Sequence, residues 1–174
     1  MQKAKQRSEI AKQDKWRIED IYATDEAWEA DYNECIRRAK EKCVYQGRLA
    51  ESALILYQAL KESDEADLLV EHVYVYAFMK YYEDTANAVY QEMSGRAQAA
   101  VTKLSEKYAF LTPEILAIDQ KKMQEYLNSD TLALYRHALE DILAKKEHAL
   151  SEKEERLLAM AGQVTASPNE IFSK

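Results

Sequence analysis

Residues 65–82, EADLLVEHVYVYAFMKYY, form the most apolar stretch of the sequence. They contain neither glycine nor proline, and their apolar side chains would fall on nearly every side of a helix. A helix that is apolar nearly all round is surrounded by other elements of its fold. The stretch therefore predicts a central helix over residues 65–82. Ser63 and Asp64 are its expected start, because both residue types cap helices.

Amphipathic segments lie on both sides of this central helix. Apolar spacings of three and four residues, together with capping residues, predict further helices over about 24–43, 50–61, 86–110, 113–118, 120–128, 130–147 and 151–162. Asp84 or Thr85 is expected to cap the helix over 86–110, and Thr112 the next one, with Pro113 at its first position. The sequence has 3 glycines and 2 prolines, too few for an all-β or Rossmann-type fold. We expect an all-α fold, a multi-helix bundle of about seven to eight helices with short loops.

The length of 174 residues is typical of one ordinary domain. Residues 1–15 are polar and are expected to form a loose N-terminal segment, so that the helical domain covers 16–174. The sequence stops soon after an apolar pair, Ile171 and Phe172. We interpret this ending as that of a truncated chain.

The net charge of −7 argues against nucleic-acid binding, because an acidic chain has no electrostatic footprint for a phosphate backbone. No stretch approaches the roughly 18 apolar residues of a membrane span, and the N-terminus lacks the apolar region of a signal peptide. Cys35 and Cys43 are two thiols without a disulfide framework, which favours a reducing compartment. We expect a cytoplasmic protein that binds neither nucleic acid nor membrane.

The three histidines, His72, His137 and His148, do not form a zinc motif. A zinc peptidase needs His-Glu-x-x-His, because two imidazoles one helical turn apart reach one ion while the glutamate activates the bound water. None of the three begins that pattern, and the sequence also lacks Glu-x-x-His, Gly-x-Ser-x-Gly and a P-loop. We expect no catalytic residue, metal site or cofactor within these 174 residues.

The 12 tyrosines are the unusual feature of the composition, and several gather around the central helix and the turn after it. They are interpreted either as core and boundary aromatics, with hydroxyls that reach water or backbone, or as the lining of a cleft that binds a peptide.

Several phrases of the sequence resemble, in order, the N-terminal domain of oligoendopeptidase F. The opening KWRIEDIY of residues 15–22 is similar to the family's Trp-x-Leu-x-Asp-Ile/Leu-Tyr phrase, which precedes the first helix. Trp28 follows at the expected place. The other matching phrases are Tyr74-Val75-Tyr76-Ala77, Asp84-x-x-Asn87-x-x-Tyr90-Gln91, Phe110-x-x-Pro113-Glu114-Ile115, Tyr135 with Leu139, and His148-x-Leu150-Ser151-x-x-Glu154-Glu155-x-Leu157-Leu158 followed by Phe172. Together they cover nearly the whole chain.

The resemblance implies a role in a zinc endopeptidase of the M3 type, a cytoplasmic enzyme that cuts short peptides. In that family the catalytic domain, with zinc on His-Glu-x-x-His, follows the region seen here, and the helical N-terminal part forms one wall of a channel above the metal. The expected partners are that catalytic domain and short peptides. The chain alone is expected to be inactive and to self-associate through an exposed docking face. The alternative is a free-standing helical module for protein interaction.

Tyr81, Asn87 and Tyr90 are the candidate residues for lining the substrate channel. The other interpretation is that Asp84, Asn87 and Tyr90 lock the turn between the two central helices, because Asp84 is placed to cap a helix while Asn87 and Tyr90 share one face.

Overall fold

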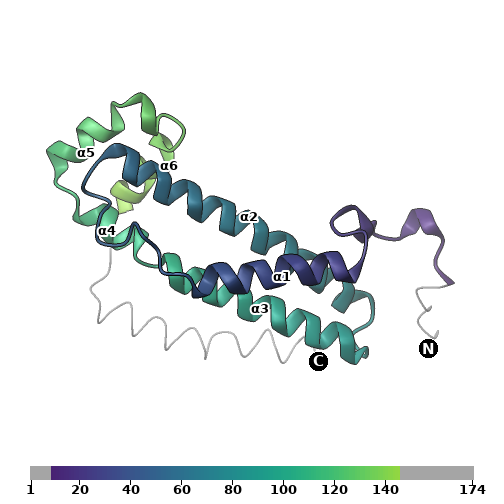
Figure 1. Cartoon of the computed structure of the whole chain (residues 1–174). Coiled ribbons are helices and arrows are strands. Elements are labelled where there is room, and N and C mark those ends of the chain that lie inside the picture. Colours follow the sequence, from purple (N-terminus) through teal and green to yellow (C-terminus); the bar gives the residue numbers. More distant parts are fainter. Residues whose placement is uncertain (1–8, 146–174) are drawn as a thin grey trace. The chain divides into compact units, whose positions relative to one another are not determined.

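The computed structural model describes residues 9–145, and these residues form helices and the turns that connect them, with no strand among them (Figure 1). The elements in chain order are η2 (Lys12–Asp14), η3 (Ile18–Asp20), α1 (Asp25–Lys40), α2 (Ala53–Glu83), α3 (Ala88–Tyr108), α4 (Leu111–Ala117), α5 (Gln120–Leu127), η4 (Asp130–Leu132) and α6 (Arg136–Ala144). The all-α prediction is confirmed for this range. The helix predicted over 151–162 lies outside the described residues.

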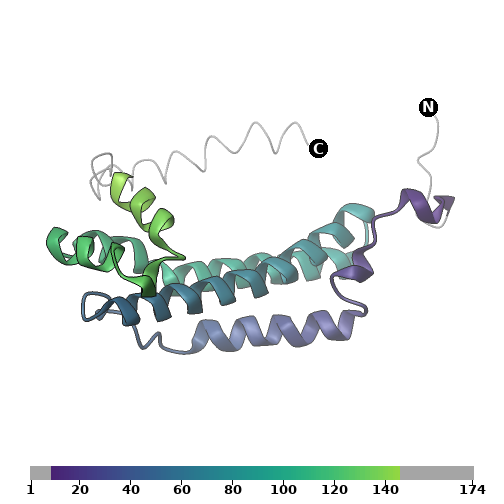
Figure 2. The same ribbon diagram turned by 90° about the horizontal axis from the view of Figure 1, so that it is seen from above.

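The chain divides into two compact units, residues 1–132 and 133–174. In the first unit α1, α2 and α3 form a three-helix bundle in which α2 is antiparallel to α1 and α3 (Figures 1 and 2). Each of the three helices contacts the other two. The 3-10 helices η3 and η4 also pack on α2. The most apolar segment therefore lies in the helix with the most neighbouring elements, as predicted. It is not covered on all sides, however, because Leu68 and Tyr82 are 58% and 63% exposed.

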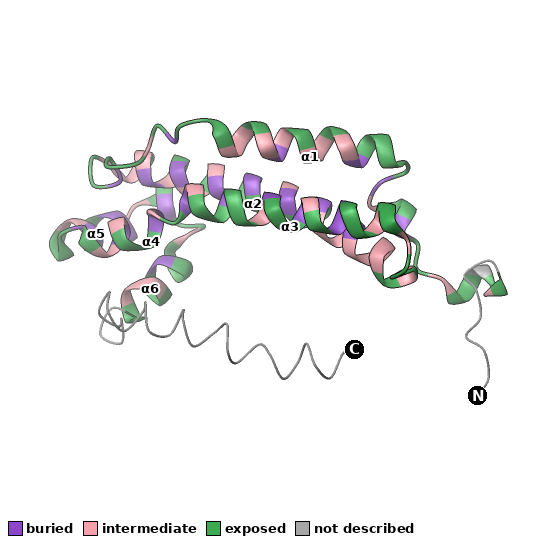
Figure 3. Cartoon of the chain, turned by 90° about the horizontal axis from the view of Figure 1, so that it is seen from below, coloured by how far each residue is buried: buried purple, intermediate pink, exposed green. Residues whose placement is uncertain are grey.

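Buried and exposed positions alternate along the three long helices (Figure 3). The largest fully buried side chains of this unit are Trp28, Leu49, Leu56, Leu104, Ile115, Leu132, Val73 and Cys35. Small residues fill the remaining contacts on α2 and α3, where Ala59, Ala66, Ala77, Ala97 and Ala100 are all at most 1% exposed. Burial of these side chains is the main favourable term in holding the bundle together.

The helices predicted over 50–61 and 65–82 form one continuous helix, α2. No glycine or proline interrupts residues 53–83, and Ser63 is buried on the core side of α2. The helix begins instead at Ser52, whose Oγ accepts a hydrogen bond of 3.2 Å from the Ile55 N–H. Serine and aspartate mark helix starts only where the chain also leaves helical geometry. The predicted helix boundary at Ser63 and Asp64 is therefore wrong. This fusion brings the described part of the chain to six α-helices, fewer than the seven to eight predicted.

Of two other predicted helix starts, one agrees with the structure and one differs. Thr24 caps α1 as predicted, accepting from the Ala27 N–H at 3.3 Å. However, α4 begins at Leu111, because the short connection after α3 stays in helical geometry at Phe110. Pro113 then falls at the third helical position, where a backbone N–H has no partner within the helix, so proline is tolerated there.

The helix predicted over 130–147 is divided at the boundary between the two units. Residues 130–132 are the 3-10 helix η4, whose Leu132 is fully buried in the first unit. The α-helix begins only at Arg136, in the second unit, and Leu134 between them is 78% exposed.

Candidate functional site

The predicted channel residues lie on both sides of the turn between α2 and α3. Asn87 is the N-cap of α3: its Oδ1 accepts hydrogen bonds from the N–H groups of Val89 and Tyr90, at 3.0 and 3.3 Å. Asp84 stays within the turn, where its Oδ1 accepts from the Ala86 N–H at 3.1 Å. The prediction of Asp84 or Thr85 as the cap is therefore wrong, because Asn87 is the residue that satisfies the free N–H groups of the helix start.

Tyr90 belongs to a cluster around the Lys80 ammonium group. The Lys80 Nζ lies 5.2 Å from the centre of the Tyr90 ring and 5.0 Å from that of Tyr76, within the range of cation–π attraction. The same nitrogen pairs with the carboxylate of Asp25 at the start of α1, which also accepts a 2.8 Å hydrogen bond from the Tyr76 hydroxyl. Burial alone would raise the pKa of Asp25, but the hydrogen bonds from Lys80 and Tyr76 outweigh it and lower the pKa. The cluster joins all three long helices.

Tyr81 is part of a different group of rings. It lies 6.3 Å from Phe78 and 5.3 Å from Tyr82, centre to centre, while Tyr74 stacks on Phe78 at 4.2 Å. Consecutive residues of a helix point about 100° apart, so Tyr81 leaves α2 in a different direction from Lys80. The structure thus brings Asn87 and Tyr90 together through the cap and places Tyr81 with the exposed rings of α2.

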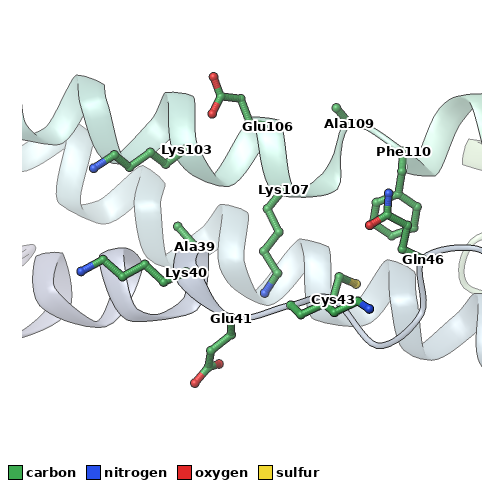
Figure 4. Close-up of a pocket in the computed structure, with 11 residues that line it drawn as sticks. Ala39, Lys40, Glu41, Cys43, Gln46, Lys103, Glu106, Lys107, Ala109 and Phe110 are labelled. Atoms are coloured by element: carbon green, nitrogen blue, oxygen red, sulfur yellow. The ribbon is translucent and has the colours of Figure 1, made fainter.

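A cleft of about 690 Å³ lies at the opposite end of the bundle (Figure 4). Four lysines line it, Lys40, Lys42, Lys103 and Lys107, together with Glu41, Glu106 and Cys43. In Figure 4 Lys107 reaches from α3 toward the segment that carries Glu41 and Cys43. Its Nζ donates a 2.9 Å hydrogen bond to the Arg38 carbonyl and lies 3.3 Å from Glu62 Oε1. The deepest lysine is therefore engaged within the protein, and none of the predicted channel residues lines this cleft.

Neither cysteine has the environment of a nucleophile. Both are buried, and burial raises the pKa of the Cys35 thiol to about 11. A thiol with a pKa that high is almost entirely protonated at neutral pH.

One residue that sequence reasoning did not single out as functional, Glu114, closes the loop between α1 and α2. Its two carboxylate oxygens accept hydrogen bonds from the N–H groups of Gly47 and Leu49, each at 3.0 Å. Gly47 has φ of 82°, a left-handed conformation that favours glycine, and Leu49 is fully buried. The available signal was the Pro113-Glu114 phrase, which matched the family pattern without revealing what the carboxylate binds.

Among residues 9–145 no group of three or more His, Cys, Asp or Glu side chains is arranged to hold a metal ion. His137 lies 3.8 Å from Asp141 within α6, and both side chains are exposed. Nor does any helix in this range combine the length and apolarity that a membrane crossing requires. The described residues thus define a helical domain whose polar side chains fasten helices and loops to one another.

Comparison with known proteins places this domain in a family. The sequence model of the family described as Oligopeptidase F matches residues 114–174. The chain is 40% identical over 168 residues to Oligopeptidase PepF of Bacillus subtilis, an alignment that covers 96% of this chain and 25% of the Bacillus protein. It is also 40% identical over 174 residues to an oligoendopeptidase F homolog of Lactococcus lactis, covering 97% of this chain and 28% of that protein.

The fold agrees with these sequence matches. The crystal structure of oligoendopeptidase-F from Enterococcus faecium superposes with a TM-score of 0.70 at 30% identity, over 85% of this chain and 29% of that one. The chain is therefore homologous over nearly its whole length to the N-terminal part of oligoendopeptidase F proteins of the M3 peptidase family, as the sequence resemblance predicted. It spans about a quarter of the length of the curated relatives that it matches.

Proposed function

We propose that this chain is the channel-wall domain of a cytoplasmic, zinc-dependent oligoendopeptidase that hydrolyses short peptides. The observation that carries the proposal is the match of at least 96% of this chain to only 25–28% of relatives named for peptidase activity. The zinc site and the chemistry then belong to the polypeptide that these relatives carry beyond the matched region. The chain itself contributes shape, limiting access to substrates thin enough to enter.

The structure of the bundle supports a wall rather than a reaction centre. In the cluster around Lys80, and in the clamp formed by the Glu114 carboxylate on the N–H groups of Gly47 and Leu49, charged groups hold helices and loops in place. Such contacts make the surface of the bundle rigid. We place Tyr81, Asn87 and Tyr90 along the channel. The cap at Asn87 would hold the α2–α3 turn in one conformation while its amide nitrogen and the tyrosine hydroxyls offer hydrogen bonds to a passing peptide.

A chimera tests the proposal. In full-length Oligopeptidase PepF of Bacillus subtilis, the matched region is replaced by this chain, and hydrolysis of a short quenched-fluorescent peptide is compared with digestion of a folded protein. We expect the chimera to cleave the peptide, to lose activity to a chelator and regain it with zinc, and to spare the folded protein. The 174-residue chain alone should cleave neither the peptide nor the folded protein.

Two results would contradict the proposal. One is robust, chelator-sensitive peptide hydrolysis by the chain alone. The other is a chimera that cleaves the folded protein as readily as the peptide, because the chain would then not restrict access. The alternative of a free-standing interaction module predicts a chimera without peptidase activity.

A further inference from the structure

The side of α2 that faces away from α1 carries apolar side chains left open to solvent. Leu68 is 58% exposed and Tyr82 is 63% exposed, while Tyr74 and Phe78 are half-buried. We call these four residues the aromatic face. The face extends from Leu68 to Tyr82, a rise of about 21 Å along the helix at 1.5 Å per residue.

The packing of the bundle explains why this side is uncovered. α1 covers one side of α2, where the Trp28 indole nitrogen donates a 2.8 Å hydrogen bond to the Val73 carbonyl. α3 covers a second side, along the line of Val70 and Tyr74. At about 100° per residue, Leu68, Phe78 and Tyr82 point to the third side, away from both neighbours.

A shallow groove extends the aromatic face toward α3. It has a volume of about 310 Å³ and is lined by Val70, Glu71, Tyr74, Gln98 and Val101. Tyr74 belongs to both the groove and the face, so the two form one continuous, largely apolar surface. Its rings already lie against one another: Phe78 stacks on Tyr74 at 4.2 Å and lies at a tilt 6.1 Å from Tyr82. Such a surface loses little side-chain entropy on binding.

We infer that the aromatic face is the surface on which the remaining polypeptide of the longer protein docks. Contiguous apolar surface rimmed by polar residues marks an interaction site, and aromatic side chains are enriched at the centres of such interfaces. This inference rests on the proposed function and adds to it the helix side that makes the contact. Tyr81 lies at the border of the face, where the docked polypeptide would meet the channel.

The occupant follows from the lengths of the relatives. The chain matches 25% and 28% of the two bacterial proteins, so about three quarters of each lies outside the matched region. A segment of that size attached to this domain needs an apolar surface to pack on, and the aromatic face with its groove offers a continuous one.

Hydroxyl-radical labelling of side chains tests this directly on two proteins, the 174-residue chain at low concentration and the Bacillus chimera described above. We expect Leu68, Phe78 and Tyr82 to be labelled in the chain and protected roughly fivefold or more in the chimera, as side chains at an interface core are. Trp28, 1% exposed, should stay unlabelled in both and reports correct folding. Val44, 60% exposed and outside the face, should be labelled equally in both.

Equal labelling of the aromatic face in chain and chimera would overturn the inference. Protection of the face already in the dilute chain would also overturn it, since residues of the chain itself would then be the cover. Labelling does not depend on catalysis, so it decides the docking surface even in a chimera that hydrolyses nothing. Hydrolysis, in turn, decides the proposed function whatever the labelling shows.

Matched variants provide an independent measurement. Leu68→Lys with Tyr82→Lys adds two charges to the face, and Val44→Lys with Val89→Lys adds the same charge at positions of similar exposure off the face. In the chimera the first pair should lower the melting temperature and speed proteolysis at the junction, and the second should not. If labelling of Trp28 shows that a chimera carrying either pair of variants is misfolded, the solubility limit of the 174-residue chain with the same substitutions is measured in place of the melting temperature and proteolysis. The first pair should raise that limit several-fold over the second, and equal limits would overturn the inference.

Discussion

The two sides of α2 carry the same residue types but differ in how far they are buried. Toward α1, Tyr76 is 3% exposed and its hydroxyl is held by Asp25. On the other side, Tyr82 is 63% exposed and lies against the rings of Phe78 and Tyr81 on its own helix. A helix that is apolar all round therefore has one side that stabilises this domain and one that is left open to solvent. The difference arises from which neighbours the fold supplies, not from the composition of the helix.

The largest expected effect separates these two sides by stability. Trp28→Ala removes a fully buried indole and its hydrogen bond to Val73 and should cost about 3–5 kcal/mol of unfolding free energy. Tyr82→Ala, on the open side, should change it by no more than about 0.5 kcal/mol. Urea unfolding of the chain measures both. Similar losses for the two variants would show that the aromatic face is already packed within this domain.

The next effect concerns the clamp at the far end of the bundle. Glu114→Ala leaves the N–H groups of Gly47 and Leu49 without their acceptor and should cost about 1.5–3 kcal/mol, the range for hydrogen bonds to a charged group. Glu114→Gln keeps one acceptor oxygen and should lie between that variant and the wild type. Hydrogen exchange at the two amides should rise in both variants. Glu125→Ala, at an exposed position of α5, is the control and should leave exchange there unchanged.

A third prediction concerns Asn87 in the α2–α3 turn, next to the end of the aromatic face. Asn87→Ala should cost about 1 kcal/mol, because it removes the cap of α3, while Asn87→Asp should be nearly neutral since aspartate also caps. In the chimera, Asn87→Asp removes the amide donor without removing the cap. A raised KM in that variant is expected from a channel role. Unchanged KM and kcat there, with lowered stability in Asn87→Ala, would assign Asn87 to the turn alone.

The sequence predicted the fold class and the central helix because both depend on composition and apolar spacing, which are local. It also located the Thr24 cap, where the residue type and the change of chain direction coincide. It failed at Ser63, a residue type that occurs both at helix starts and inside helices, and at Asp130–Leu132, where burial of Leu132 overrides the local pattern. Tertiary packing decided both positions.

The candidate site was less predictable for the same reason. Asn87 and Tyr90 are joined by a hydrogen bond from the Tyr90 backbone N–H, and which of Asp84 and Asn87 caps α3 depends on where the chain leaves the turn. The role of Glu114 depends on a loop 65–67 residues earlier in the chain, which no local pattern encodes. Likewise, only the positions of α1 and α3 show which side of α2 remains open.

The smallest expected effect concerns a group of charged side chains on α1 that are partly exposed to solvent. Glu34 pairs with Arg37 and Arg38, and hydrogen bonds from Arg37 and then Arg38 lower its pKa from 4.5 to about 2. A lowered pKa in the folded state means that the pair stabilises the protein above pH 4.5 and that this contribution fades as the pH falls toward 2. Because all three side chains are about a third exposed or more, the contribution should be only about 0.2–1 kcal/mol. Glu34→Gln should therefore be slightly less stable than the wild type in urea at pH 7, with a difference that shrinks steadily between pH 4.5 and 3. A difference that stayed constant over that range would show that the loss comes from packing of the side chain rather than from its charge.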